Sequence, residues 1–202
     1  MSCSEFHGSQ AEVDQQTQAV SDLASQHGAG ELQYAVEAEE RSRLWTARHN
    51  CYYANIALRP GSRSVTTDCC VPISALPTII TQTKQDIINH GLTGPIVGHV
   101  GDGNFHSMLL FDPEDPEEFK TCKKVADRMA RLAIELGGEI FLDKPKFDLL
   151  FSGTCTGEHG IGLGKIELLE YQFGTAGLQA MKQIKLALDP LGLMNPGKLF
   201  TF

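Results

Sequence analysis

Gly98-His99-Val100-Gly101-Asp102-Gly103-Asn104-Phe105-His106 is the stretch from which the rest of the chain can be understood. An Asp-Gly pair between apolar residues is a strong local signal for a tight β-hairpin. With Asp102-Gly103 at the two central turn positions, we expect His99 to lie opposite His106. Directly opposed residues share one face of an antiparallel pair, with Cβ atoms roughly 5 Å apart. Two imidazoles at that separation can bind one metal ion, about 2.1 Å from each nitrogen.

A second cluster supplies a carboxylate and a further imidazole. It reads Thr154-Cys155-Thr156-Gly157-Glu158-His159-Gly160-Ile161-Gly162. Together with the hairpin it predicts a three-ligand site of His99, His106 and Glu158, with room left for a substrate. The same residues allow plainer interpretations: each histidine can be a structural strand residue, and Glu158 can cap a helix that starts near Ile161.

Composition limits the classes of protein that the chain can represent. Its 202 residues suit one domain, and its formal charge of −8 argues against nucleic-acid binding. No apolar stretch reaches the roughly 20 residues of a membrane-spanning helix, and the first residues form no targeting segment. The six cysteines include no C-x-x-C pair, which favours reduced thiols and an intracellular location. Cys155 can be a reactive thiol, although a small packing residue is the simpler interpretation.

Hydrophobic periodicity gives an alternation of helices and strands. We expect helices over residues 10–27, 37–58, 74–89, 116–136, 163–173 and 175–188, and strands over 32–36, 64–71, 95–100 and 104–111. Ser74 is the expected cap of the third helix. This order predicts an α+β fold in which helices pack on one face of an antiparallel sheet, followed by a helical C-terminal tail.

Three motifs in this order resemble the C-terminal, substrate-capping domain of FAD-linked oxidases of the vanillyl-alcohol-oxidase type. They are Gly98-His99…Gly103-Asn104-Phe105-His106, Gly157-Glu158-His159-Gly160-Ile161-Gly162, and Asp189-Pro190…Met194-Asn195-Pro196-Gly197-Lys198. Including Leu44-Trp45-Thr46-Ala47-Arg48-His49 and Asp68-Cys69-Cys70-Val71-Pro72, the chain is most similar to the cytochrome-linked D-lactate dehydrogenases of mitochondria. The resemblance implies a ferredoxin-like cap domain that acts on D-2-hydroxy acids, with FAD as cofactor and cytochrome c or another electron acceptor as partner.

The resemblance also implies roles for individual residues. His99, His106 and Glu158 would hold a divalent ion, zinc or manganese, that lowers the pKa of the substrate hydroxyl. His159 would be the base that takes the hydroxyl proton, and Arg48 would bind the substrate carboxylate. The resemblance further implies that Asn195, Glu158 and His159 lie beside the flavin. Without the family, Arg48 is equally a surface helix residue paired with Glu39 or Glu40, and Asn195 is a turn residue.

The sequence also departs from this family in two ways. We expect residues 1–202 to be an N-terminally truncated C-terminal domain, because no Gly-rich segment suited to a dinucleotide pyrophosphate is present and the FAD-binding domain is absent. We also expect an insertion at about 139–153. Both features predict a substrate- and metal-binding domain that does not turn over substrate alone.

Two other functions stay open at this point. The chain can be a non-catalytic partner or isoform that associates with the full-length enzyme. It can also be a free-standing zinc hydrolase that uses His99, His106 and Glu158. The family is mitochondrial, whereas the lack of a targeting segment here leaves a cytoplasmic location open.

Overall fold

The structure is a computed structural model, and it describes residues 4–30, 32–138 and 153–200. The chain divides into two compact units, Met1–Ala54 and Asn55–Phe202, which are described separately. The expected insertion at 139–153 lies outside the described residues, except for Gly153.

The first unit is helical. α1 (Gln10–Gln26) and α2 (Ala38–His49) fall in predicted helices, and α3 (Cys51–Ile56) begins in this unit and ends in the next. A capping box starts α1, in which the backbone N–H of Ser9 donates to the Glu12 carboxylate at 2.7 Å. The strand predicted at 32–36 is wrong: these residues have no regular structure. Tyr34 and Val36 are largely exposed, so no buried face supports a strand there.

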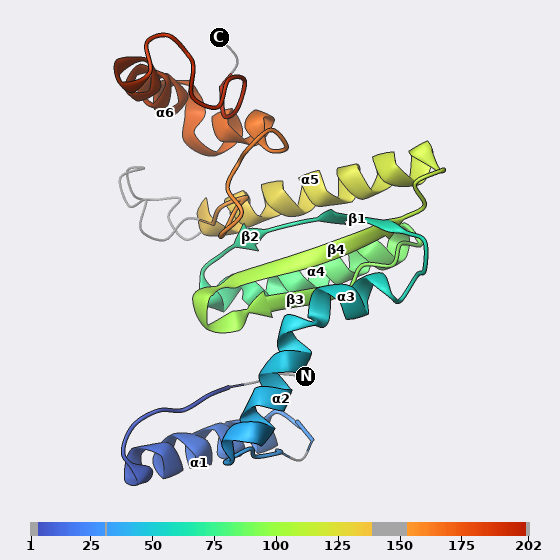
Figure 1. Cartoon of the computed structure of the whole chain (residues 1–202), viewed down its shortest axis with the longest axis vertical. Helices are drawn as coiled ribbons and strands as arrows, with labels where there is room; N and C mark the ends of the chain where they lie inside the picture. Colours follow the sequence, from blue (N-terminus) through green and yellow to red (C-terminus); the bar gives the residue numbers. More distant parts are fainter. Residues whose placement is uncertain (1–3, 31, 139–152, 201–202) are drawn as a thin grey trace. The chain divides into compact units, whose positions relative to one another are not determined.

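The second unit is built around β4 (Asn104–Phe111), a strand whose eight residues are all buried. β3 (Ile96–His99) pairs with one edge of β4, while β1 (Arg63–Thr66) and β2 (Cys69–Cys70) pair with the other edge. Every pairing is antiparallel, which gives the four-stranded sheet in Figure 1.

β1 and β2 together form the strand predicted at 64–71, with an interruption at Thr67 and Asp68. Both halves keep one register on β4, since Val65 lies opposite Leu109 and Cys69 opposite Phe105. Asp68 therefore lies at the level of His106.

At the interruption, Thr67 replaces part of the regular backbone ladder with its side chain. The backbone N–H of Ser107 donates to Thr67 Oγ1 at 2.7 Å, and the N–H of Thr67 donates to the carbonyl of Ser107 at 2.9 Å. The carbonyl of Thr67 is thereby left to face the His106 ring, whose Nδ1 is 3.3 Å away.

Helices cover one face of this sheet (Figure 1). η1 (Ile73–Ala75) leads into α4 (Leu76–Asn89), and α5 (Pro116–Gly138) follows β4, in agreement with the predicted helix at 116–136. Ser74 does not cap α4, because it lies within η1 and the N-cap position is Ala75. The core beneath the helices contains Phe105, Leu109, Ile79, Ile87, Cys122, Val125, Met129 and Ala133, all less than 5% exposed.

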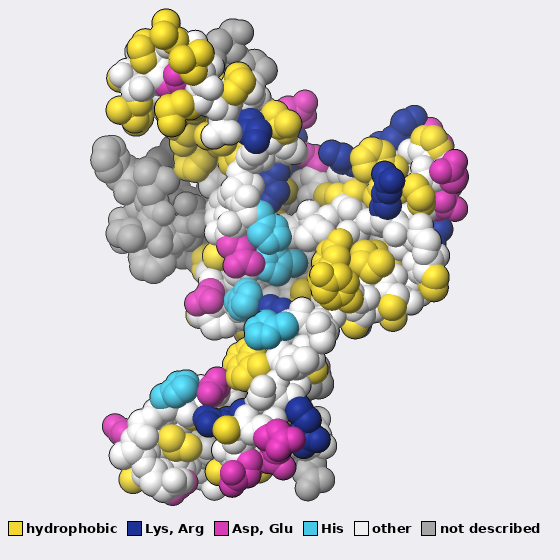
Figure 2. Space-filling view, in the orientation of Figure 1, with side chains coloured by type: hydrophobic (Ala, Val, Ile, Leu, Met, Phe, Trp, Pro, Cys, Tyr) yellow, Lys and Arg dark blue, Asp and Glu magenta, His cyan; other side chains and the backbone are white. Residues whose placement is uncertain are grey.

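Because side chains alternate along a strand, Asn104 and His106 point to the face opposite Phe105 and the helices. Figure 2 shows histidine side chains at the surface of the second unit, beside an acidic group. The sheet therefore separates the apolar core on one face from a cluster of polar, ionisable side chains on the other.

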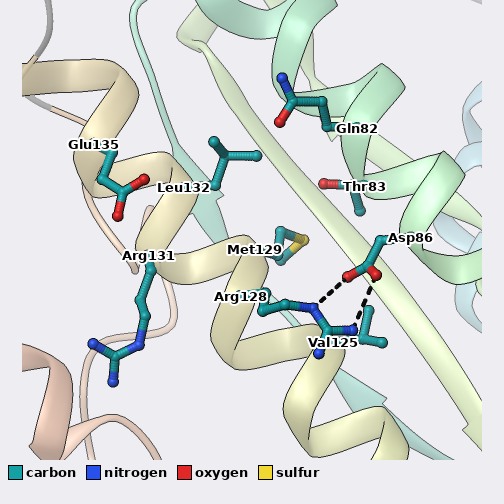
Figure 3. A pocket seen from close by; sticks show the side chains of 9 residues that line it. All are labelled: Gln82, Thr83, Asp86, Val125, Arg128, Met129, Arg131, Leu132 and Glu135. Atoms are coloured by element: carbon teal, nitrogen blue, oxygen red, sulfur yellow. Dashed lines mark hydrogen bonds and ion pairs between the residues drawn. The ribbon is translucent and has the colours of Figure 1, made fainter.

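An open groove of about 390 Å³ runs between α4 and α5 on their outer side (Figure 3). At one end Arg128 donates two hydrogen bonds to Asp86, at 2.9 and 3.0 Å. This ion pair fastens α4 to α5 from opposite sides of the groove.

The C-terminal part of the second unit is α6 (Ile166–Leu188), which is broken at Gly174 (φ 68°, ψ 172°). Two helices meeting near residue 174 were expected, so this prediction is confirmed. The Tyr171 hydroxyl donates to Glu135 at 2.5 Å and Arg131 lies over the Tyr171 ring, so α6 is tied to α5. The predicted α+β class, with an antiparallel sheet, helices on one face and a helical C-terminal segment, is confirmed.

Within the described ranges, no helix is both long enough and apolar enough to span a membrane.

Candidate metal centre

The hairpin between β3 and β4 carries the two predicted histidines, but its turn differs from the prediction. Its loop is Val100–Gly103 and begins as a short 3₁₀ turn, η2 (Val100–Asp102), followed by Gly103 in the left-handed region at φ 70°. His99 pairs with Asn104, and Val97 pairs with His106. The predicted two-residue turn at Asp102-Gly103 and the direct His99–His106 pair are therefore wrong.

The longer loop has a tertiary cause. The carbonyl of Gly103 accepts a hydrogen bond from the N–H of Val71 at 3.0 Å, and Cys70 Sγ donates to the carbonyl of Asp102 at 3.3 Å. A Cβ atom on Gly103 would lie 2.0 Å from the Val71 carbonyl oxygen. The segment after β2 therefore fixes the end of this loop, and that segment lies some thirty residues earlier in the sequence.

The two histidines nevertheless share one face of the sheet. The loop is two residues longer than predicted, so every pair shifts by two positions and the alternation of faces is retained. His99 and His106 become diagonal neighbours, with ring centroids 6.2 Å apart and ring planes at 86°. The structure thus brings the rings together by a different register.

The loop after residue 153 brings Glu158 and His159 to the same place. Thr154 forms a two-way backbone bridge with Cys70, at 2.7 and 3.1 Å, which places the loop beside β2. Glu158 Oε1 then lies 3.0 Å from His106 Nε2. The His159 ring stacks on the His106 ring at a centroid distance of 4.9 Å.

Asp68 lies beneath this cluster and is 1% exposed. Its Oδ2 accepts hydrogen bonds from Thr156 Oγ1 and from the backbone N–H groups of Gly157, Glu158 and His159, all at 2.8–3.0 Å. Although burial pushes the pKa of the Asp68 carboxyl upward, the hydrogen bonds from the His159 N–H and its neighbours hold that pKa well below its ordinary value. Asp68 is therefore a buried carboxylate.

His106 is the buried candidate ligand of this cluster. Burial lowers the pKa of its imidazole, and the nearby Asp68 carboxylate only partly opposes this effect. Its Nδ1 faces Asp68 Oδ1 at 3.6 Å and the Thr67 carbonyl at 3.3 Å. A proton on Nδ1 leaves the lone pair of Nε2 directed toward Glu158. An imidazole held in this way by a carboxylate or carbonyl is typical of a metal ligand.

Two sets of three groups have ligand atoms within 4.8 Å of one another: His99, His106 and Glu158, and Asp68, His106 and His159. The second set would use an Asp68 carboxylate that already accepts five hydrogen bonds. In the first set, by contrast, Glu158 and His99 are exposed. Two imidazoles and one carboxylate form a typical donor set for a catalytic divalent metal.

The other predicted site residues lie elsewhere in the chain. Arg48 is on α2 in the first unit, and Asn195 is in the turns after α6, where it has φ 47°. The interpretation of Glu158 as a helix cap is wrong, because the helix begins at Ile166 with Lys165 at its N-cap. Cys155 is fully buried, and burial raises the pKa of its thiol, in agreement with a packing role.

Sequence reasoning missed three residues that organise the site. Asp68 holds the loop, Asn104 donates to Asp68 Oδ1 at 2.9 Å, and Lys165 donates to the backbone carbonyls of Asp68 and Cys155. Asp68 and Asn104 lie within quoted motifs, but their roles depend on contacts across 36 to 91 positions of the chain.

Fold and site together define an α+β domain with a histidine–carboxylate cluster on the open face of its sheet. The chain belongs to the family FAD linked oxidases, C-terminal domain, which matches residues 1–141 and 149–199. The gap in this match, residues 142–148, falls within the segment where an insertion is expected.

Individual relatives agree with this family. A probable mitochondrial D-lactate dehydrogenase of Danio rerio is 45% identical over 96% of this chain and 36% of its own length. The mitochondrial D-lactate dehydrogenase [cytochrome] of Arabidopsis thaliana is 37% identical over 96% of this chain and 32% of its own length. Glycolate oxidase subunit GlcD of Escherichia coli K12 is 31% identical over 96% and 36%, respectively. The chain thus spans about a third of the length of these relatives.

Proposed function

We propose that this chain is the substrate- and metal-binding domain of an FAD-dependent D-lactate or D-2-hydroxy-acid dehydrogenase, located in mitochondria as its relatives' names indicate. The observation that carries the proposal is the convergence of His99, His106 and Glu158 from two separate segments. Similarity to D-lactate dehydrogenases across 96% of the chain supports the substrate class.

The donor set fits a divalent ion such as zinc or manganese. His99 and His106 would supply two neutral nitrogens, and Glu158 would supply one negative oxygen. When bound, such an ion supplies Lewis acidity toward the hydroxyl and carboxylate oxygens of a 2-hydroxy acid. Only three side chains are required, so positions remain for a substrate with two oxygens.

The remaining residues of the chain would handle the proton and the substrate charge. His159 would be the general base that accepts the hydroxyl proton. In support, its ring stacks on that of His106 and half of its side chain is exposed. Arg48 would bind the substrate carboxylate, for which its planar guanidinium is suited. Asn195, together with Glu158 and His159, would line the side of the flavin, which when bound would supply the hydride-accepting chemistry. Cytochrome c or another acceptor would be the electron-transfer partner.

Metal content and ligand response test this proposal. The chain, purified without chelator and dialysed after incubation with zinc, is expected to retain about one equivalent of metal by elemental analysis. Glu158→Gln is expected to lose most of it, whereas Glu167→Gln, on the exposed start of α6, is expected to retain it. A wild-type metal content below about a tenth of an equivalent would contradict the proposal.

Substrate binding is tested by the melting temperature of the zinc-loaded chain. A ligand that binds only the folded state raises this temperature with concentration. D-lactate is expected to raise it more than L-lactate does, and removal of zinc is expected to abolish the difference. Equal responses to the two enantiomers would contradict the substrate class.

A further inference from the structure

We propose that Asp68 is the positioning residue of this centre. Its carboxylate holds two segments in place against each other: the hairpin that carries both histidines and the loop that carries Glu158. The inference rests on the proposed metal site and extends it to a residue that is not itself a ligand. Three observations support it: how Asp68 is held, what its two oxygens contact, and how little room its neighbours have.

The backbone of Asp68 is fixed independently of its side chain. Asp68 lies in the interruption between β1 and β2, where its carbonyl accepts a hydrogen bond from Lys165 Nζ at 2.9 Å. The same ammonium group donates to the carbonyl of Cys155, at the start of the site loop. Lys165 therefore links the strand and the loop through their backbone carbonyls, and this link holds the backbone from which the Asp68 carboxylate projects.

One carboxylate oxygen organises the loop. Asp68 Oδ2 accepts from three consecutive backbone N–H groups, those of residues 157–159, and from Thr156 Oγ1. Successive N–H groups that converge on one anion form a nest and fix the local backbone conformation. Glu158 and His159 project from this stretch, so the direction of both side chains depends on Asp68.

The other oxygen faces the hairpin. Asp68 Oδ1 accepts from Asn104 Nδ2 at 2.9 Å and lies 3.6 Å from His106 Nδ1. Asn104 is the partner of His99 in the strand register. Asp68 thus lies directly beside His106. Through the side-chain amide of Asn104, it is also linked to the residue that pairs with His99.

Close packing around Asn104 and Gly157 restricts movement of the loop against the hairpin. Asn104 is 6% exposed and also donates to the carbonyl of Cys69 at 3.0 Å. A Cβ atom on Gly157 would lie 1.9 Å from Asn104 Nδ2 and 2.9 Å from Asp68 Oδ1. The loop and the hairpin therefore approach as closely as the backbone allows, with the carboxylate between them.

The test compares zinc affinity among variants of the 202-residue chain, measured by competition with a chromophoric chelator. Asp68→Asn keeps the size of the side chain and removes its charge, and it is expected to weaken zinc binding about 10- to 100-fold. Asp86→Asn is the matched control. It too removes a hydrogen-bonded carboxylate, in this case one that accepts two hydrogen bonds from Arg128 between α4 and α5. Its zinc affinity is expected to equal that of the wild type.

A second readout separates positioning from general stability. The visible absorption of the Co²⁺-loaded chain reports the geometry around the ion, and Asp68→Asn is expected to change this spectrum while circular dichroism shows an unchanged fold. If Asp68→Asn does not fold, Thr156→Val removes a single donor to Asp68 Oδ2 and is expected to weaken zinc binding by a smaller factor.

The outcomes distinguish this inference from the proposed function. A wild-type chain that binds no zinc would overturn the metal site itself, and this inference with it. A folded Asp68→Asn chain with wild-type zinc affinity and an unchanged Co²⁺ spectrum would overturn the positioning role alone. If Asp68→Asn does not fold and Thr156→Val does, a zinc affinity of Thr156→Val equal to that of the wild type would overturn the positioning role.

Discussion

Replacing Gly157 with alanine tests the close approach of loop and hairpin by adding one methyl group. The new Cβ atom would lie 1.9 Å from Asn104 Nδ2, and real contacts of this kind essentially never fall below 3.0 Å. Asn104 is buried and cannot turn toward solvent, so either its amide or the loop must move. Movement of the loop breaks the hydrogen bonds that the backbone N–H groups of residues 157–159 donate to Asp68. Movement of the amide breaks the two that Asn104 donates, to Asp68 and to the Cys69 carbonyl.

The magnitude follows from these two bonds. A hydrogen bond to a charged group contributes about 1.5–3 kcal/mol, and one between neutral groups about 0.5–1.5 kcal/mol. We therefore expect Gly157→Ala to lower the free energy of unfolding by about 2–4.5 kcal/mol. Because Glu158 moves with the loop, zinc affinity is expected to fall at least about tenfold.

Equilibrium urea unfolding of the metal-free chain measures the first quantity, and chelator competition measures the second. Gly164→Ala is the matched control, since a Cβ atom there meets nothing within 4 Å. It is expected to leave both quantities close to wild type, or to raise stability slightly by restricting the unfolded chain. Equal stability of Gly157→Ala and Gly164→Ala, within about 0.5 kcal/mol, would show that the loop and the hairpin are not in close contact at Gly157.

Three further predictions concern the sheet and its helices. Leu109→Ala, at a fully buried position of β4, is expected to lower the free energy of unfolding by about 2–5 kcal/mol in urea titrations. Gly103→Ala is expected to destabilise the chain by more than about 1 kcal/mol, since it combines a left-handed φ with a clash against the Val71 carbonyl; a wild-type melting temperature would contradict this. Arg59, 2.6 Å away, lowers the pKa of the Glu118 carboxyl, so this pair stabilises the fold above the ordinary pKa of 4.5 and the contribution is lost as pH falls through the lowered folded-state value. Glu118→Gln is therefore expected to cost about 0.5–1 kcal/mol at pH 7 and progressively less in acid, and a pH-independent difference would contradict it.

Local signals predicted the parts of the fold that local physics controls. The helix predicted at 116–136 has a continuous apolar stripe, and the structure differs only at its end, where the helix continues through both glycines to Gly138. The break at Gly174 followed in the same way from a glycine between two periodic segments. The strand expected at 32–36 failed because a short apolar run is not a strand without a partner to pair with.

The hairpin shows where local rules give way to distant contacts. Asp102-Gly103 is a good two-residue turn taken alone. However, the N–H of Val71 donates to the Gly103 carbonyl, and the loop is Val100–Gly103, two residues longer than predicted. The error left the face of His99 and His106 unchanged because the shift in pairing was even. A shift of one residue in pairing would have separated the two rings.

Asp68 could not be assigned a role from the sequence for a related reason. Its position opposite His106 depends on β1 and β2 sharing one register through an interruption, which alternation of hydrophobicity does not reveal. Its five donors come from segments 36 to 91 positions away. An acidic residue within an otherwise uncharged strand segment was the only local signal.

X-ray absorption at the zinc edge of the zinc-loaded chain tests the metal centre most directly. If His99, His106 and Glu158 hold the ion, the inner shell contains only nitrogen and oxygen at about 2.0–2.2 Å, with the outer-shell pattern of two imidazoles. A sulfur neighbour at about 2.3 Å, or a spectrum without imidazole scattering, would show that zinc binds elsewhere and would contradict the account.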